Sequence, residues 1–487
     1  MRAVLICLAL LPILAANAAG ADLPVLKTTR PAVSVREGER LGVDSWRLAP
    51  ELNPDVYDVD LENGAPKRVA FISDVDSIVF TVEEGRTYDF IIEHGADRCA
   101  TRLRGVRMVP AAVFDAEYQA AHRGKITVLV PEVYELVNVA IALTPTAVAD
   151  RNLVYQDSEY YAAVRRWFDP FRGHAVVAAI DAELKADPFR YHNIKMDGYS
   201  FEFDANSTIV QSRIYDRTSF PSSRRNSLRP YLPALQSFAD TSNFRAFYRR
   251  HRSTYAEQIA FYADTAGIHE MRAWLDRQFP GTKPYDAYKV VFSPLVAYNQ
   301  SSTWFESNGF RELQPHVNYP YARDLGRRVM GARLSPRAVV VLRGDIVFTE
   351  LNHGYLSPTS GRYMDRIARA ISRRNYWVDS TKGSGYYAGN ALFDEYMNWG
   401  LVSLRVTDFT PVEERPRHIQ IVDRMMTKAR GFPRFAEFDA FLVDLYRNRK
   451  EGETISDLYP RIIEWFEKEN AAAETATGDR EREPASK

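Results

Sequence analysis

Three residues in the second half of the chain form a pattern that is typical of zinc peptidases. Thr349, Glu350 and His353 stand in the frame T-E-x-x-H. In an H-E-x-x-H helix, two histidines four residues apart share one face and bind Zn²⁺, and the glutamate activates a metal-bound water. By this template Glu350 is the predicted general base and His353 a predicted zinc ligand. Thr349 stands at the position of the first ligand, and a threonine hydroxyl binds zinc poorly.

A third zinc ligand is expected from a later helix. Residues 391–406 show a helical pattern and carry Asp394 and Glu395. Glu395 follows His353 at a spacing compatible with zinc peptidases whose third ligand is a glutamate, so we take it as the tentative third ligand. If the ligand missing at Thr349 is replaced from elsewhere, the candidates are His316, His174 and Asp394.

The elements around the motif are predicted from hydrophobic pattern and from helix signals. The β-branched and aliphatic run 338–342 predicts a buried strand. Gly344 and Asp345 are then expected to turn the chain into a helix, with Asp345 as its N-cap, and Pro358 is expected to end that helix. The motif would therefore lie on a short helix that is entered directly from a buried strand.

Residues 125–470 are expected to form one mostly helical domain with a small sheet. Residues 126–130 predict a buried strand, and Pro131 predicts the entrance of a helix that begins with Glu132. The Gly-, Ser- and Tyr-rich segment 376–390 is expected to be a loop that borders a cleft.

Residues 30–110 predict an antiparallel β-sandwich that serves as an accessory module. Apolar residues alternate over 78–82 and again over 88–92, and the sequence Glu83-Glu84-Gly85 between them predicts the turn of a hairpin. The predicted fold class is therefore α+β.

The two ends of the chain are not expected to belong to these domains. Residues 1–21 predict a signal peptide, because Arg2 precedes an apolar run and small residues follow it. The run is shorter than the roughly 20 residues that a membrane-spanning helix needs. We therefore expect an exported protein, either periplasmic or secreted. Residues 471–487 predict a disordered tail.

Composition limits the classes of partner. The chain has 487 residues, 46% of them apolar, and 63 basic residues balance 63 acidic ones. These proportions are those of a folded globular protein, and the zero net charge argues against general nucleic-acid binding. No stretch after the leader is apolar for long enough to span a membrane. The expected partner is a peptide or another protein.

Several short segments, in their order along the chain, resemble the bacterial family called domain of unknown function 4932. The segments are VPEVYELVNVAIALTP, FRGHAVV, VVFSPLVAYNQSS, PHVNYPY and FTELNHGYLSP, and the resemblance covers about residues 125–465. It implies a gluzincin-like metallopeptidase fold, with Glu350 as base, His353 as zinc ligand and Glu395 as tentative third ligand. It implies no particular substrate, and Thr349 departs from the metallopeptidase pattern.

Three functional hypotheses follow. The first is a zinc-dependent hydrolase, a peptidase of unknown substrate, in which another residue replaces the missing ligand. The second is a binding protein that retains the zincin fold without catalysis, and Thr349 is the observation that favours it. The third is a metal-free hydrolase in which Glu350 and His353 act as an acid/base pair, although no G-x-S-x-G nucleophile motif supports it.

Overall fold

The computed structural model divides the chain into two compact units, Met1–Met108 and Val109–Lys487. The residues that it describes are 23–38, 40–48, 50, 54–61, 65–106, 111–188, 190–217, 226–322, 333–379, 381–382 and 391–480. Helices account for 52% and strands for 21% of the structure, and the strand-rich unit precedes the helical one, which confirms the α+β prediction. The predicted signal peptide, residues 1–21, lies outside the described residues.

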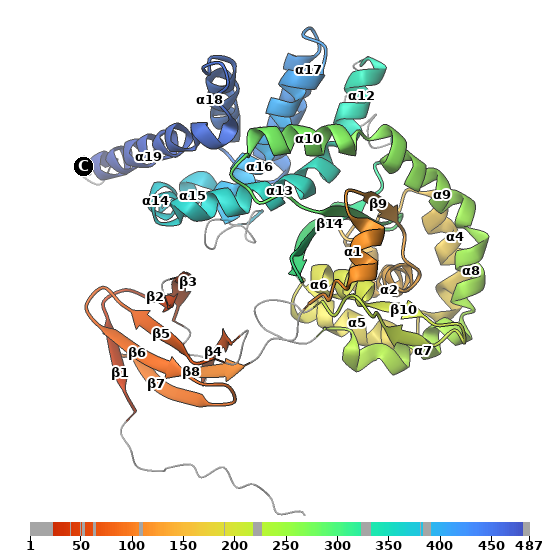
Figure 1. Cartoon of the computed structure of the whole chain (residues 1–487), viewed down its shortest axis with the longest axis horizontal. Coiled ribbons are helices and arrows are strands. Elements are labelled where there is room, and N and C mark those ends of the chain that lie inside the picture. The colour runs from red at the N-terminus through yellow and green to blue at the C-terminus, as the bar shows by residue number, and fades with distance from the viewer. Residues whose placement is uncertain are drawn as a thin grey trace, which may run out of the picture. The chain divides into compact units, whose positions relative to one another are not determined.

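The first unit consists of two four-stranded sheets (Figure 1). Its strands are β1 Val25–Thr28, β2 Ala32–Glu37, β3 Arg40–Arg47, β4 Asp55–Asp60, β5 Lys67–Ile72, β6 Ser77–Val82, β7 Thr87–His94 and β8 Asp97–Val106. The sheet β3-β2-β5-β6 is antiparallel, as predicted. In the sheet β1-β7-β8-β4, however, only β7 and β8 are antiparallel, and the pairs β1–β7 and β4–β8 are parallel.

The predicted hairpin between residues 78–82 and 88–92 is wrong. Strand β6 pairs with β5, whereas β7 pairs with β8 and β1, so the turn at Gly85 leads from one sheet to the other. Both strands still bury alternate residues, because Val82 and Phe90 pack in the same core between the sheets. Alternation reports which face of a strand is buried, and it does not report the pairing partner.

The second unit contains one larger sheet, with the strand order β13-β14-β12-β9, and a two-stranded ribbon. Its strands are β9 Ile126–Leu129, β10 Phe201–Phe203, β11 Ile209–Gln211, β12 Ala287–Ser293, β13 Ser301–Ser307 and β14 Phe310–Asn318. Strand β12 is parallel to both β9 and β14, and β13 is antiparallel to β14. Strand β13 is therefore an edge strand among the described residues. The predicted strand at 126–130 is confirmed.

Helices make up most of the second unit. Before the sheet is completed they are α1 Ala116–His122, α2 Glu132–Leu143, α3 Pro145–Ala149, α4 Glu159–Phe168, α5 Ala175–Ala186, α6 Arg190–Asp197, α7 Leu232–Thr241, α8 Phe244–Arg250, α9 Arg252–Ala260 and α10 Ile268–Gln278. After it they are α12 Pro336–Arg343, α13 Asp345–Ser360, α14 Met364–Ala370, α15 Arg374–Trp377, α16 Ala391–Phe409, α17 Arg415–Arg424, α18 Phe435–Arg447 and α19 Ile455–Arg480. Two π-helical turns extend this set, η4 Phe261–Thr265 after α9 and η7 Met425–Ala429 after α17. Short 3₁₀ turns complete it: η1 Asp169–Phe171, η2 Gly198–Ser200, η3 Arg229–Tyr231 and η5 Gly361–Tyr363.

The segment before the T-E-x-x-H motif is a helix, so the buried strand predicted at 338–342 is wrong. Ser335 caps α12 by accepting a hydrogen bond from the backbone N–H of Ala338, and Pro336 occupies its first turn. This start signal outweighs the β-propensity of the valine run. Helix α13 does begin at Asp345, but its N-cap is Gly344, and Pro358 lies within its last turn.

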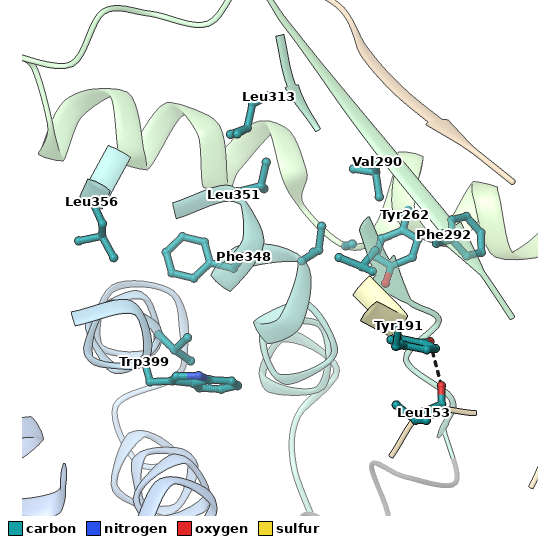
Figure 2. Close-up of a cluster of buried hydrophobic side chains, with 14 of the residues drawn as sticks. Leu153, Tyr191, Tyr262, Val290, Phe292, Leu313, Phe348, Leu351, Leu356 and Trp399 are labelled. Atoms are coloured by element: carbon teal, nitrogen blue, oxygen red, sulfur yellow. Dashed lines mark hydrogen bonds between the residues drawn. The ribbon is translucent and has the colours of Figure 1, made fainter. Parts of the chain in front are cut away.

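Helix α13 lies in the core of the second unit, between the sheet and α16 (Figure 1). Figure 2 shows Leu351 directed toward Leu313 of β14, and Trp399 of α16 on the other side of Phe348. Gly354 permits close contact with the sheet, because a Cβ there would lie 2.8 Å from the Tyr285 hydroxyl and 2.9 Å from a methyl of Leu313. The motif helix is thus fixed on both sides.

The C-terminal segment differs from the prediction. Helix α19 continues to Arg480, so the disordered tail predicted from residue 471 is wrong for 471–480, and residues 481–487 lie outside the described residues. In the part of the chain that the structure describes, no helix has the length and apolar character needed to cross a membrane.

Candidate active-site cleft

The T-E-x-x-H motif lines a cleft of about 1250 Å³ in the second unit. Thr349, Glu350 and His353 reach it from α13, and Asp394 and Glu395 reach it from α16. Helices α13 and α16 pack directly on each other, as the predicted pairing of base and third ligand requires. Other parts of the lining come from α6, the edge strand β13, and the segment α17–η7. The structure therefore gathers four of the predicted site residues, and Thr349, along one concave surface.

Glu350 is a buried carboxyl group beside a second carboxylate. Burial, followed by the negative charge of Glu395, raises the pKa of Glu350 to about 8, against the opposing charges of Lys195 and Arg430. Only 8% of the residue is exposed. At neutral pH Glu350 is therefore mostly protonated, so it can donate a proton or a hydrogen bond into the cleft.

His353 faces α16 through its Nε2 atom. The side-chain nitrogen of Asn398 lies 2.9 Å from this Nε2 and 3.5 Å from a carboxylate oxygen of Glu395. Because the carboxylate only accepts hydrogen bonds, the Asn398 amide must present its NH₂ group to both neighbours. Nε2 of His353 consequently accepts, and the ring is neutral. Burial lowers the pKa of His353, which favours the same state.

Glu395 is held by two donors. The indole N–H of Trp399, one helical turn later, donates to Oε1 of Glu395 over 3.0 Å, and the guanidinium of Arg430 forms an ion pair with the same oxygen. Only 4% of Glu395 is exposed. Both oxygens are therefore engaged with protein groups, Oε1 with Trp399 and Arg430 and Oε2 with Asn398.

These residues do not form the predicted three-ligand zinc site. The Thr349 hydroxyl donates to the backbone carbonyl of Ile346 over 2.7 Å, so it is used within its own helix. Nε2 of His353 and the carboxylate of Glu395 are both occupied by α16 and η7 neighbours. Within the described ranges, no three His, Cys, Asp or Glu side chains are grouped so that they could share a metal ion. We therefore derive no chemical step through a metal.

Two of the three alternative ligands lie elsewhere. His316 is buried on β14, its Nε2 lies 2.9 Å from Oε1 of Gln314, and burial lowers its pKa well below the usual value. His174 caps helix α5, and its other ring nitrogen lies 3.3 Å from the Ser237 hydroxyl. Neither lines the cleft. Asp394 does, accepting a 3.4 Å hydrogen bond from Ser357, and burial raises its pKa to about 6.

The sequence did not identify three residues that shape the electrostatics of the site. Asn398 stands three residues after Glu395 on the same face of α16, and that spacing could have indicated it. Arg430 directly follows η7 and Lys195 lies on α6, and no local pattern connects them to the motif. Lys195 is buried, donates to the backbone carbonyl of Asn299 over 2.6 Å, and has its pKa lowered to about 7 by burial.

The edge strand β13 forms another wall of the cleft. Ser301, Ser302 and Trp304 line it from this strand, and Tyr298 lines it from the loop before. The Ser301 hydroxyl lies 2.7 Å from Nδ1 of His192 on α6. Trp304 is 44% and Tyr298 53% exposed. This wall is neutral and polar, with two accessible aromatic rings.

A buried ion pair fixes the start of the motif helix. Asp345 lies 3.8 Å from Arg405 of α16, and His418 of α17 lies 3.6 Å from the other oxygen of Asp345. All three side chains are almost completely buried. Arg405 also donates to the backbone carbonyl of Val341 in α12 over 3.0 Å. The pair thereby joins α12, α13 and α16, which together position Glu350 and His353.

Comparison with family models, with curated proteins and with solved structures found no match for this chain. The functional argument therefore depends on the residues of the cleft themselves.

Proposed function

We propose that the second unit is a peptide-binding module of metallopeptidase-like architecture, and that the peptide lies extended along β13. The observation that carries this proposal is that an edge strand forms a wall of the same cleft that contains Glu350 and His353. An edge strand presents backbone N–H and C=O groups that pair with an added strand. The resemblance to the domain of unknown function 4932 family, and export from the cell, are parts of the same proposal.

The size and lining of the cleft support a peptide ligand. Its volume, about 1250 Å³, exceeds the roughly 300–1000 Å³ of pockets for small molecules. Trp304 and Tyr298 offer exposed rings next to the strand edge, where they can pack on alternate side chains of a bound peptide. The protonated Glu350 and the neutral His353 add uncharged polar contacts at low desolvation cost.

Binding to a synthetic peptide tests the proposal. The probe is a fluorescent peptide of about ten residues that repeats Thr-Val-Gln. A control peptide of the same sequence carries N-methyl groups on alternate residues, which remove the N–H donors there. We expect the full chain to bind the first peptide in fluorescence anisotropy and the methylated one at least about 10-fold more weakly. Trp304→Ser should weaken binding, whereas Val412→Ser, a change at an exposed site outside the cleft lining, should not. Absence of binding, or equal binding of both peptides, contradicts the proposal.

A zinc-dependent peptidase is the second candidate, because Glu350, His353 and Glu395 line one cleft from two packed helices. Its test is the zinc content of chain purified without chelator, together with mass spectrometry of the incubated peptide. The binding proposal expects no stoichiometric zinc and an intact peptide. Thr349→His, which completes H-E-x-x-H, is then expected to raise the zinc content toward one ion per chain. Cleavage that depends on zinc and is lost in Glu350→Gln would favour the peptidase instead.

A further inference from the structure

The cleft carries a second chemical feature, a set of basic side chains on one of its walls. We call Lys382, Arg424, Lys428 and Arg430 the basic wall. Arg424 ends α17, Lys428 lies in the π-helical turn η7, and Arg430 follows that turn. The backbone N–H of Arg430 donates to the carbonyl of Met425, five residues earlier. This wider turn breaks the α-helical spacing, and π-helical turns are frequent at functional sites.

Lys382 and Lys428 are the two exposed lysines of the basic wall. The ammonium group of Lys382 lies 3.2 Å from the backbone carbonyl of Lys428, and both residues are exposed. Neither forms one of the ion pairs of the described residues, although the charge of Lys382 helps to lower the pKa of Asp379, whereas Arg430 is paired with Glu395. Exposed ammonium groups that are not held in an ion pair attract a bound anion.

The acidic lining residues do not balance this charge. Arg343 and the basic wall give five cationic side chains, against four acidic ones, Asp150, Glu350, Asp394 and Glu395. Glu350 is mostly neutral at pH 7, because burial raises its pKa to about 8. The whole chain has no net charge, so the positive excess is a property of the cleft.

We propose that the ligand of this cleft is an extended peptide with acidic side chains, whose carboxylates lie against Lys382 and Lys428. This inference rests on the peptide-binding function proposed above and names the class of peptide. Strand β13 supplies the backbone pairing, and the basic wall supplies the selectivity. Because both lysines are exposed, the selectivity depends on ionic strength.

Three peptides of the same length separate the inference from the function on which it rests. They repeat Thr-Val-Glu, Thr-Val-Gln and Thr-Val-Lys, and their affinities for the full chain are measured by anisotropy at low and at moderate salt. We expect the Glu peptide to bind about 10-fold more tightly than the Gln peptide at low salt, and the Lys peptide to bind most weakly. The preference should shrink to a few-fold at moderate salt.

Lysine variants test which residues carry the preference. Lys382→Gln combined with Lys428→Gln should reduce the Glu-over-Gln preference to less than about 3-fold, because only the Glu peptide carries the carboxylates that these lysines attract. Lys428→Glu should shift the preference toward the Lys peptide. Lys468→Glu alters an exposed lysine of α19, paired with Glu464, by the same two units of charge and serves as the charge-matched control.

The outcomes are distinguishable. If the Gln peptide binds and the Glu peptide binds no more tightly, the acidic-peptide inference is wrong and the peptide-binding function stands. If a preference for Glu exists but survives loss of both lysines, the basic wall is not its source and the inference is wrong as stated. If none of the three peptides binds, the proposed function itself fails.

Discussion

The side-chain amide of Asn398 donates to Nε2 of His353 over 2.9 Å and also faces Glu395. One side chain of α16 thus fixes the ring of the motif histidine in its neutral form and separates it from the neighbouring carboxylate. The nitrogen that would bind a metal in an H-E-x-x-H helix is here a hydrogen-bond acceptor for protein. This contact links the charge state of His353 to the identity of residue 398.

Replacement of Asn398 by aspartate should change that charge state. A carboxylate next to Nε2 favours the imidazolium, so we expect Asn398→Asp to raise the pKa of His353 by at least about one unit. Histidine-selective NMR titration measures it, with His353→Gln to assign the signal. Asn448→Asp, at an exposed position, is the matched control. An unchanged pKa would mean that Asn398 and His353 do not interact in solution.

Glu350 should make the protein less stable as the pH rises. Its folded-state pKa, about 8, lies above the ordinary value of 4.5, because burial and Glu395 oppose ionisation. The stabilisation from the protonated group is therefore complete below about pH 4.5 and is lost as the pH rises toward 8. Glu350→Gln keeps the neutral form at every pH, so at pH 8.5 it should unfold at higher urea concentration than wild type, by about 1 kcal/mol or more.

The same comparison at pH 4.5 is the internal reference for Glu350. There both proteins carry a neutral group at position 350, and the difference in unfolding free energy should be small. Glu451→Gln removes an exposed carboxylate and controls for the loss of one charge. If Glu350→Gln has the same stability relative to wild type at both pH values, the carboxyl is not buried as the structure has it.

Local signals predicted the helices that carry the site, but not the contacts between them. The helix at Asp345 and the helix at 391–406 were both predicted, because each has an apolar side and the first follows a turn residue. The strand prediction at 338–342 was wrong, since a run of valines is ambiguous and the Ser335-Pro336 start signal decided it. Strand partners in the first unit could not be predicted either, because pairing depends on distant segments.

The candidate site was predicted only in part, because local patterns predict helices but not the contacts between them. The spacing of residues on two predicted helices was enough to place Glu350, His353 and Glu395 in one cleft. The roles of Asn398, Arg430 and Lys195 depend on how α16, η7 and α6 pack, and no periodic pattern encodes that. These are the residues that hold His353 neutral and engage Glu395, so the metal prediction depended on contacts the sequence does not show.

Gly354 should be required for the close packing of α13 on the sheet. A Cβ at this position would lie 2.8 Å from the hydroxyl of Tyr285 and 2.9 Å from Leu313, and both are held in the core. We expect Gly354→Ala to lower the free energy of unfolding by about 1–3 kcal/mol through overpacking. Gly361→Ala, at the residue directly after the C-terminus of the same helix and with no atom within 4 Å of its Cβ, is the control and should change stability by less than about 0.5 kcal/mol. Equal stability of the two variants would contradict the packing of α13 against β14.

Removal of one partner from the buried pair of Asp345 and Arg405 should destabilise the protein far more than removal of one partner from an exposed pair. Their side chains are 0% and 1% exposed and lie 3.8 Å apart, so removal of one partner leaves a buried charge without compensation. We expect Arg405→Met to cost about 3–5 kcal/mol in urea unfolding. The double variant with Asp345→Asn should recover part of this loss, because no isolated charge remains. Arg366→Gln breaks a 2.7 Å pair with Glu467 at the surface and should cost no more than about 1 kcal/mol. Similar losses for Arg405→Met and Arg366→Gln would show that this pair does not position the motif helix.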